Sequence, residues 1–100
     1  MHVISKKKLK QFGLKHPNAE VSLSYWYKLT IQHQWQSFND ICQTFPSASQ
    51  VKNFVVFNIG GNNFRLITYI DYQSNKVFIR EVLTHAEYDK NYWKKDNWYQ

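Results

Sequence analysis

Several residue types are scarce in this chain of 100 residues, and each shortage excludes a class of protein. The single cysteine, Cys42, rules out an internal disulfide, so the sequence carries no sign of an oxidising compartment. No apolar run approaches the length that spans a membrane, and the N-terminal MHVISKKKLK lacks the apolar segment of a secretion signal. We therefore expect a cytoplasmic protein with no membrane partner.

Proline and glycine are also few, with two and three copies, whereas hydrophobic residues make up 43% and aromatic residues 18% of the chain. This apolar content argues against disorder. The length suits one domain with a core of its own, residues 1–100, in which residues 95–100 are a candidate flexible tail.

Acidic residues are outnumbered, with seven Asp and Glu against thirteen Lys and Arg, for a net charge of +6. The excess gathers near the N-terminus, where Lys6, Lys7 and Lys8 precede the first acid, Glu20. A basic field of this kind favours a polyanionic partner, and nucleic acid is the first candidate. A solvated surface with no partner explains the same charge equally well.

The first half of the chain contains one clear helix and one ambiguous segment. Ser5 is a candidate N-cap for a helix that Pro17 ends. The stretch VSLSYWYKLTI alternates as a strand does, and periodicity alone favours a strand. Against this, residues 18–36 hold no Gly or Pro and exceed the usual strand length, and Asn18 is a candidate helix cap.

The second half predicts three strands, KNFVVFNI, FRLITYIDY and KVFIREVLT. GGNN and QSN separate them, and the glycines supply the positive backbone angles that a tight hairpin needs. Before them, HVI is a short apolar start and SFNDICQTF indicates one or two more helical turns. We therefore expect an α+β fold, with an N-terminal strand and two to three helices packed on an antiparallel β-meander.

The turns predict which side chains face one another across the meander. If Tyr72 pairs with Lys76 across QSN, Arg65 lies opposite Leu83. His85, two residues further on, then points to the same face of the sheet as Arg65.

The other hairpin adds a third polar side chain to this face. If Gly61 and Asn62 form a two-residue turn, Asn58 lies opposite Arg65. Arg80 has the opposite parity from His85 and should leave by the other face. A slip of one residue in either turn breaks the convergence, so the prediction is conditional on both.

These side chains suit the cleavage of RNA without a metal ion. The reaction needs a group that takes the proton of a 2′-hydroxyl, a group that protonates the leaving 5′-oxygen, and cations that meet the charge on the phosphoryl oxygens. His85 is a candidate acid or base, and Tyr88 a candidate proton donor or orienting group. Arg65 and Lys90 are the candidate cations, with Asn58 as an RNA contact.

Each of these residues also has an ordinary structural explanation. A histidine after a strand is more often a surface or capping residue, and a tyrosine there usually anchors a loop. GGNN is most simply a hairpin turn, because no strand, glycine loop and helix surround it in that order. No metal or cofactor is predicted, since Cys42 and the four histidines are scattered without ligand spacing.

The stretch VFNIGGNNFRLITYIDYQSNKVFIREVLTHAEYDK resembles the C-terminal half of HigB-type toxins, which are mRNA interferases of the RelE superfamily. MHVIS and FPSAS also match the pattern of that family, so the resemblance extends to about residue 94 and is most specific over residues 55–90. It implies a compact sheet flanked by helices, with residues 18–36 helical. It also implies cleavage of translated mRNA on the ribosome and neutralisation by a HigA-like antitoxin.

The resemblance implies roles for individual residues as well. Arg65 occupies the place where the superfamily often keeps a phosphate-binding arginine. His85 and Tyr88 occupy the region after the strand that often supplies the acid–base and orienting groups. The resemblance gives less support for a family role at Lys90. Basic residues of the N-terminal helix become candidate contacts to ribosomal RNA, namely Lys6, Lys7 and Lys8.

Two other functions fit the same sequence. One is an RNA-binding module without catalysis, and the other is a RelE-superfamily toxin directed at DNA gyrase. The polar set at the end of the sheet favours the ribonuclease. The aromatic tail, with Tyr92, Trp93, Trp98 and Tyr99, can pack on the core, stack on bases or receive the antitoxin.

Overall fold

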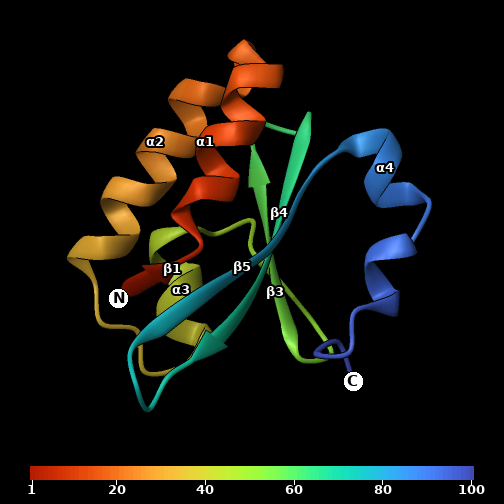
Figure 1. Cartoon of the computed structure of the whole chain (residues 1–100). Coiled ribbons are helices and arrows are strands. Elements are labelled where there is room, and N and C mark those ends of the chain that lie inside the picture. The colour runs from red at the N-terminus through yellow and green to blue at the C-terminus, as the bar shows by residue number, and fades with distance from the viewer.

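The computed structural model describes all residues, 1–100, and places helices on both faces of one sheet (Figure 1). The elements are β1 (His2–Ile4), α1 (Lys6–Lys15), α2 (Pro17–Gln32), α3 (Phe38–Thr44), β2 (Ser49–Val51), β3 (Phe54–Ile59), β4 (Phe64–Asp71), β5 (Lys76–Thr84), α4 (His85–Asp89) and the 3₁₀ helix η1 (Tyr92–Lys95). The predicted α+β fold, with an N-terminal strand and helices on an antiparallel meander, is confirmed. No helix combines the length and apolar character needed to cross a membrane.

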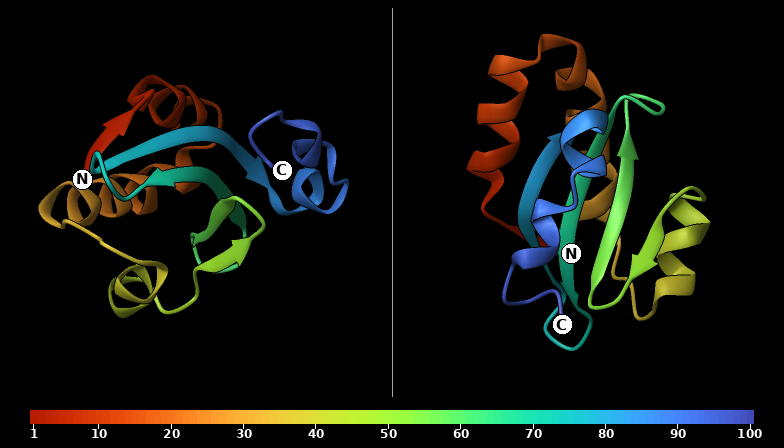
Figure 2. Two further views of the ribbon diagram at one scale, coloured as in Figure 1. Left: turned by 90° about the horizontal axis from the view of Figure 1, so that it is seen from below. Right: turned by 90° about the vertical axis from the view of Figure 1, so that its right-hand side faces the viewer.

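The sheet has five strands in the order β1-β5-β4-β3-β2. β1 pairs in parallel with β5, and the strands from β2 to β5 form the antiparallel meander. The sequence did not indicate β2, because this edge strand is only three residues long. β4 lies in the middle of the sheet, and both of its faces are covered (Figure 2).

The ambiguous segment is a helix, as the resemblance implies, but it spans Pro17–Gln32 rather than residues 18–36. Its buried residues are Ala19, Leu23, Trp26 and Thr30. Their spacing of four, three and four places them on one helical face. The alternation in the sequence misleads because several of its apolar members, among them Val21 and Tyr25, are exposed.

The first helix ends before Pro17 as predicted, because α1 stops at Lys15 with His16 as its C-cap. Pro17 also begins α2, where its missing N–H costs nothing. The prediction of Asn18 as a helix cap is wrong, since Asn18 lies inside α2 and His16 is the residue at the cap. Ser5 does precede α1, but it adopts a left-handed φ of 72° and its side chain makes no capping hydrogen bond.

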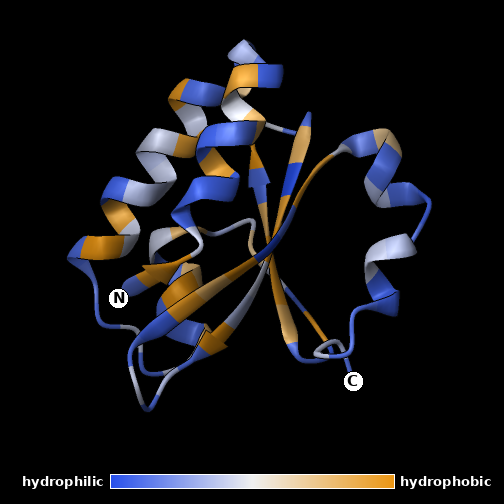
Figure 3. Cartoon of the chain, in the orientation of Figure 1, coloured by the Kyte–Doolittle hydropathy of each residue, from blue (hydrophilic) through white to orange (hydrophobic).

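Two clusters of buried residues hold the molecule together. The larger cluster, 17 residues, lies between the first three helices and one face of the sheet. The smaller cluster lies on the opposite face and consists of Phe54, Val56, Ile67, Trp93 and Tyr99. The strands are accordingly largely apolar, whereas α4 and η1 are mostly polar (Figure 3). The C-terminal segment thus supplies two of the five residues of the second core.

The turn between β4 and β5 differs from its prediction by one residue. Asp71, not Tyr72, pairs with Lys76. If this register continued along the strands, Arg65 would face Val82, and His85 would be displaced from the face of Arg65.

A β-bulge in β5 corrects this difference. The ladder shifts by one residue between Ile67 and Thr68 of β4, where Arg80 is the extra residue on β5. The shift restores the predicted pairing of Arg65 with Leu83. The pairing is therefore as predicted, although the turn on which the prediction rested is not.

The bulge also overturns the prediction for Arg80. This side chain does not leave by the other face, because the extra residue changes the alternation of β5. The Arg80 guanidinium meets Asp96 in the C-terminal segment, which covers the face on which Arg65 also lies.

Candidate active site

Arg65 is the most tightly held polar side chain at this end of the sheet. Nη1 donates to the carbonyl oxygens of Asn62 and Phe64, both at 3.1 Å, and Nη2 donates to Oδ1 of Asn62 at 2.6 Å. Only 8% of the residue is exposed. Arg65 is therefore a buried residue, and its hydrogen bonds make the guanidinium a fixed cation.

The guanidinium of Arg65 keeps donors for a ligand. It has five N–H groups, and three of them bond to the chain, which leaves Nε–H and one N–H of Nη2. Unbonded N–H groups of a guanidinium are donors that can bind phosphate oxygens. Nε makes no hydrogen bond within the chain and is not fully enclosed. The ion pairs of the chain join Arg80 to Asp96 and His85 to Asp89, so no carboxylate neutralises Arg65.

Tyr88 of α4 covers one side of this cation. The Cζ atom of Arg65 lies 5.4 Å from the centre of the Tyr88 ring, within the range of a cation–π contact. The other neighbour of Tyr88 is Trp93, whose ring is stacked on it at 5.1 Å with an interplanar angle of 10°. Nε1 of Trp93 also donates to the Tyr88 carbonyl at 3.0 Å.

His85 begins α4 directly after β5. Its backbone N–H donates to the carbonyl of Asn63 at 3.0 Å, which ties it to the turn that also holds Arg65. Nδ1 lies 3.0 Å from Oδ2 of Asp89, and 45% of the side chain is exposed. With Asp89 on Nδ1, Nε2 is the ring atom that can exchange a proton with a ligand.

A capping box fixes the turn from β5 into α4. The Thr84 hydroxyl accepts from the N–H of Glu87 at 3.2 Å, and the Thr84 N–H donates to Oε1 of Glu87 at 2.9 Å. This motif stops the strand at one residue and starts the helix at the next. It therefore sets where His85 leaves the sheet.

The other predicted site residues divide into two groups. Asn58 is exposed and pairs with Arg65 across β3 and β4, as expected, so it belongs to the same end of the sheet. Lys90 follows α4 and lines a separate hollow with Glu81 and Glu87. No hydrogen bond or ring contact joins Lys90 to Arg65.

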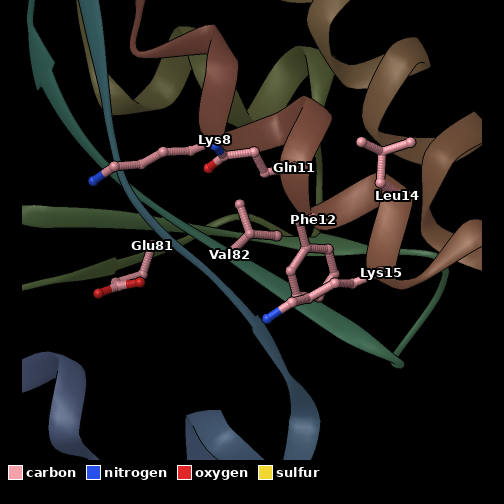
Figure 4. Close-up of a pocket in the computed structure, with 7 residues that line it drawn as sticks. All are labelled: Lys8, Gln11, Phe12, Leu14, Lys15, Glu81 and Val82. Atoms are coloured by element: carbon pink, nitrogen blue, oxygen red, sulfur yellow. The ribbon is translucent and has the colours of Figure 1, made fainter.

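The three N-terminal lysines lie on α1, on the opposite face of the sheet from α4 (Figure 1). Nζ of Lys6 lies 4.4 Å from the centre of the Tyr27 ring, and Nζ of Lys8 donates to the carbonyl of Arg80 at 3.1 Å. Lys7 is exposed. Figure 4 shows Lys8 beside β5, in a hollow that Lys15 also lines.

Sequence reasoning missed three residues of this arrangement. Asn62 orients Arg65, Asp89 holds His85, and Trp93 supports Tyr88. The spacing of four between His85 and Asp89 could have indicated their contact, because residues four apart are neighbours on a helix. Asn62 and Trp93 had no comparable signal, since their roles depend on contacts that the fold creates.

The fold and this cluster together define a class of protein. Helices on both faces of a five-stranded sheet, whose strands β2 to β5 form an antiparallel meander, are consistent with a RelE-like fold. A family model described as HigB_toxin, the RelE-like toxic component of a toxin-antitoxin system, matches residues 19–91. The chain therefore belongs to the HigB toxin family.

Curated relatives agree with this assignment. The chain is 31% identical over 93 residues to the mRNA interferase HigB of Escherichia coli O6:H1, covering 90% of each chain. It is 34% identical over 92 residues to the mRNA interferase toxin HigB of Escherichia coli strain K12, covering 89% of this chain and 88% of the relative. The mRNA interferase HigB of Shigella flexneri matches to the same extent. The predicted resemblance is confirmed.

Proposed function

We propose that this protein is an mRNA interferase, a toxin that cuts translated mRNA on the ribosome without a metal ion and is neutralised by a HigA-like antitoxin. The proposed site of action is the cytoplasm, where translation takes place. The observation that carries the proposal is Arg65, a fixed cation with two unbonded N–H groups that contacts Tyr88 of α4, the helix that His85 begins. The names of the relatives support the same reaction.

The reaction that suits these groups is attack by a 2′-hydroxyl on the adjacent phosphorus. The O2′–P bond forms and the P–O5′ bond breaks, giving a 2′,3′-cyclic phosphate and a free 5′-hydroxyl. The 2′-hydroxyl proton leaves as the nucleophile attacks, and the departing O5′ receives a proton. We assign a proton transfer to Nε2 of His85, because Asp89 occupies Nδ1.

Arg65 acts on the charge that builds on the phosphoryl oxygens. Its side chain is already oriented before substrate arrives, so little reorganisation is needed as the transition state forms. Tyr88 holds the guanidinium from its ring face, and Asn58 is placed to contact RNA at the same end of the sheet. Lys90 is a weaker candidate for this site, since it lines a separate hollow.

Binding to the ribosome is assigned to the basic surface. The net charge of +6 attracts RNA over distances at which no specific contact exists. Lys6, Lys7 and Lys8 lie on the face of the sheet opposite α4, so they can contact ribosomal RNA while mRNA occupies the site. Lys7 is the most suitable for such a contact, because Lys6 lies over a ring and Lys8 bonds to β5.

Expression of the chain without an antitoxin is expected to stop growth through loss of translated mRNA. The measurement is mapping of transcript ends in arrested cells, with cuts expected inside translated regions. Intact mRNA together with damaged DNA would favour a toxin directed at DNA gyrase. Intact mRNA and intact DNA, with RNA still bound, would favour a binding module without catalysis.

Cleavage is expected to survive EDTA when the ribosomes are stabilised separately, for example with polyamines. The reason is that Arg65 and His85 supply the cation and the proton transfer without help from a metal. The measurement is single-turnover cleavage of a ribosome-bound message with and without chelator. Loss of cleavage that zinc or manganese alone restores would contradict the metal-free reaction.

A further inference from the structure

The C-terminal segment, residues 92–99, packs against one face of the sheet. Trp93 and Tyr99 are buried against Phe54, with ring centres 6.5 and 5.6 Å from it. The backbone N–H of Asn53 donates to the Tyr99 carbonyl at 3.3 Å, and the Asn53 side chain donates to the Trp98 carbonyl. The segment therefore has defined contacts from η1 to its end.

Arg80 latches this segment to β5. Nε and Nη2 of Arg80 donate to the two carboxylate oxygens of Asp96, both at 2.8 Å, and the guanidinium lies 3.9 Å from the centre of the Trp98 ring. Hydrogen bonds from Arg80 lower the pKa of Asp96 below its ordinary value, with a further contribution from the Trp98 N–H. Arg80 reaches Asp96 because the β-bulge turns it onto this face.

The latched segment also determines what supports α4. This helix has only five residues and none of them is buried, so it has little stability of its own. Its connections to the rest of the chain include the capping box at its start, the hydrogen bond from the His85 N–H to the Asn63 carbonyl, and Trp93 of the second core. Both His85 and Tyr88 lie on this short helix, so their positions depend on these connections.

We propose that Trp93 is a positioning residue for the reaction: through Tyr88, the latched C-terminal segment holds Arg65 and α4 in the geometry that receives the phosphate. The inference rests on the proposed function and adds to it a series of side-chain contacts that leads from Trp93 to Arg65. Trp93 stacks on Tyr88, and Tyr88 covers Arg65. Trp93 is 5% exposed, so it supports the site from within and does not stack on RNA bases.

Replacement of Trp93 tests this role. Trp93→Ala is expected to lower the single-turnover cleavage rate about 10²-fold, because misplacement of reacting groups by about 1 Å has an effect of this size. Trp93→Phe keeps a ring against Tyr88 and should recover most of that rate. Binding of the message to the protein should change much less than the rate, since Arg65 keeps its charge.

Two control variants separate positioning from stability. Val56→Ala removes buried volume from the same second core without touching the stack, and it should lower the melting temperature while keeping the rate. Tyr92 precedes Trp93 in the chain and is 67% exposed, so Tyr92→Ala should change neither the melting temperature nor the cleavage rate. If Val56→Ala loses rate in proportion to its melting temperature, as Trp93→Ala does, Trp93 is only a core residue and the inference is overturned.

A readout without cleavage keeps the inference independent of the proposed function. In a ¹⁵N-labelled protein, the hydrogen-bonded Nη–H protons of Arg65 should exchange with water faster in Trp93→Ala than in wild type or Val56→Ala. If wild type does not cut RNA but this difference is seen, the proposed function fails and the positioning role stands. Equal exchange in all three proteins would overturn the positioning role.

Discussion

Replacement of Arg65 with lysine is expected to lower the rate of mRNA cleavage about 10²- to 10³-fold, the usual effect of losing one donor that meets transition-state charge. Lysine keeps the charge but lacks the planar guanidinium, whose five N–H groups allow Arg65 to bond to the turn and still offer donors to a phosphate. The measurement is single-turnover cleavage of a translated message, with growth arrest as a second readout. Lysine is preferable to alanine here because Arg65 is buried and hydrogen bonded.

The alanine variant is expected to damage the fold as well as the rate. Arg65→Ala removes the side-chain donor to the Phe64 carbonyl in a buried position, and an unsatisfied buried group costs about 1–3 kcal/mol. A lower melting temperature should therefore accompany its loss of activity. Thermal melting of both variants tells the two effects apart.

The turn that holds Arg65 offers a matched pair of controls. Asn62→Ala removes the Oδ1 atom that orients Nη2, so an intermediate loss of rate is expected. Asn63→Ala, in the same turn, removes a side chain that makes no hydrogen bond to Arg65 and should cut at nearly the wild-type rate. A folded Arg65→Lys protein with wild-type cleavage would exclude Arg65 as the phosphate-binding group.

The pairing of Arg65 with Leu83 shows how far hydrophobic patterns and turn residues carry a prediction. Strand order and the antiparallel meander follow from local signals, namely apolar runs separated by GGNN and QSN. The predicted pairing of Arg65 with Leu83 is correct, but only because the bulge at Arg80 offsets a turn that differs from its prediction by one residue. A bulge depends on packing on both faces of the strand, so a pattern of period two does not reveal it.

The sequence did not predict the second core, because this core also depends on packing between distant segments. Trp93 and Tyr99 are four and ten residues beyond the end of α4, in a stretch without a helical or strand period. Their burial depends on Phe54, about forty residues earlier in the chain, and on the latch between Arg80 and Asp96. The sequence indicated that the tail is aromatic, but only the fold separates the buried Trp93 from the exposed Tyr92.

Replacement of His85 with glutamine is expected to lower the cleavage rate about 10²- to 10⁴-fold, the range for loss of a group that transfers a proton. Glutamine keeps a polar side chain of similar length but does not exchange a proton near neutral pH. The melting temperature should change little, because the side chain is 45% exposed and only its ring bonds to Asp89. The measurement is the single-turnover rate as a function of pH, with melting as the folding control.

Asp89→Asn provides the matched control for this assignment. It removes the charge beside Nδ1 while leaving the imidazole in place, so its loss of rate should be smaller than that of His85→Gln. If His85 transfers a proton, the limb of the pH profile that belongs to it disappears in His85→Gln and is kept in Asp89→Asn. A His85→Gln protein with the wild-type profile would place the proton transfer on another residue, and the histidine would then serve only to begin α4. Because the backbone N–H of His85 holds the turn at Asn63 in either case, a loss of activity without a change in the pH profile would not support catalysis.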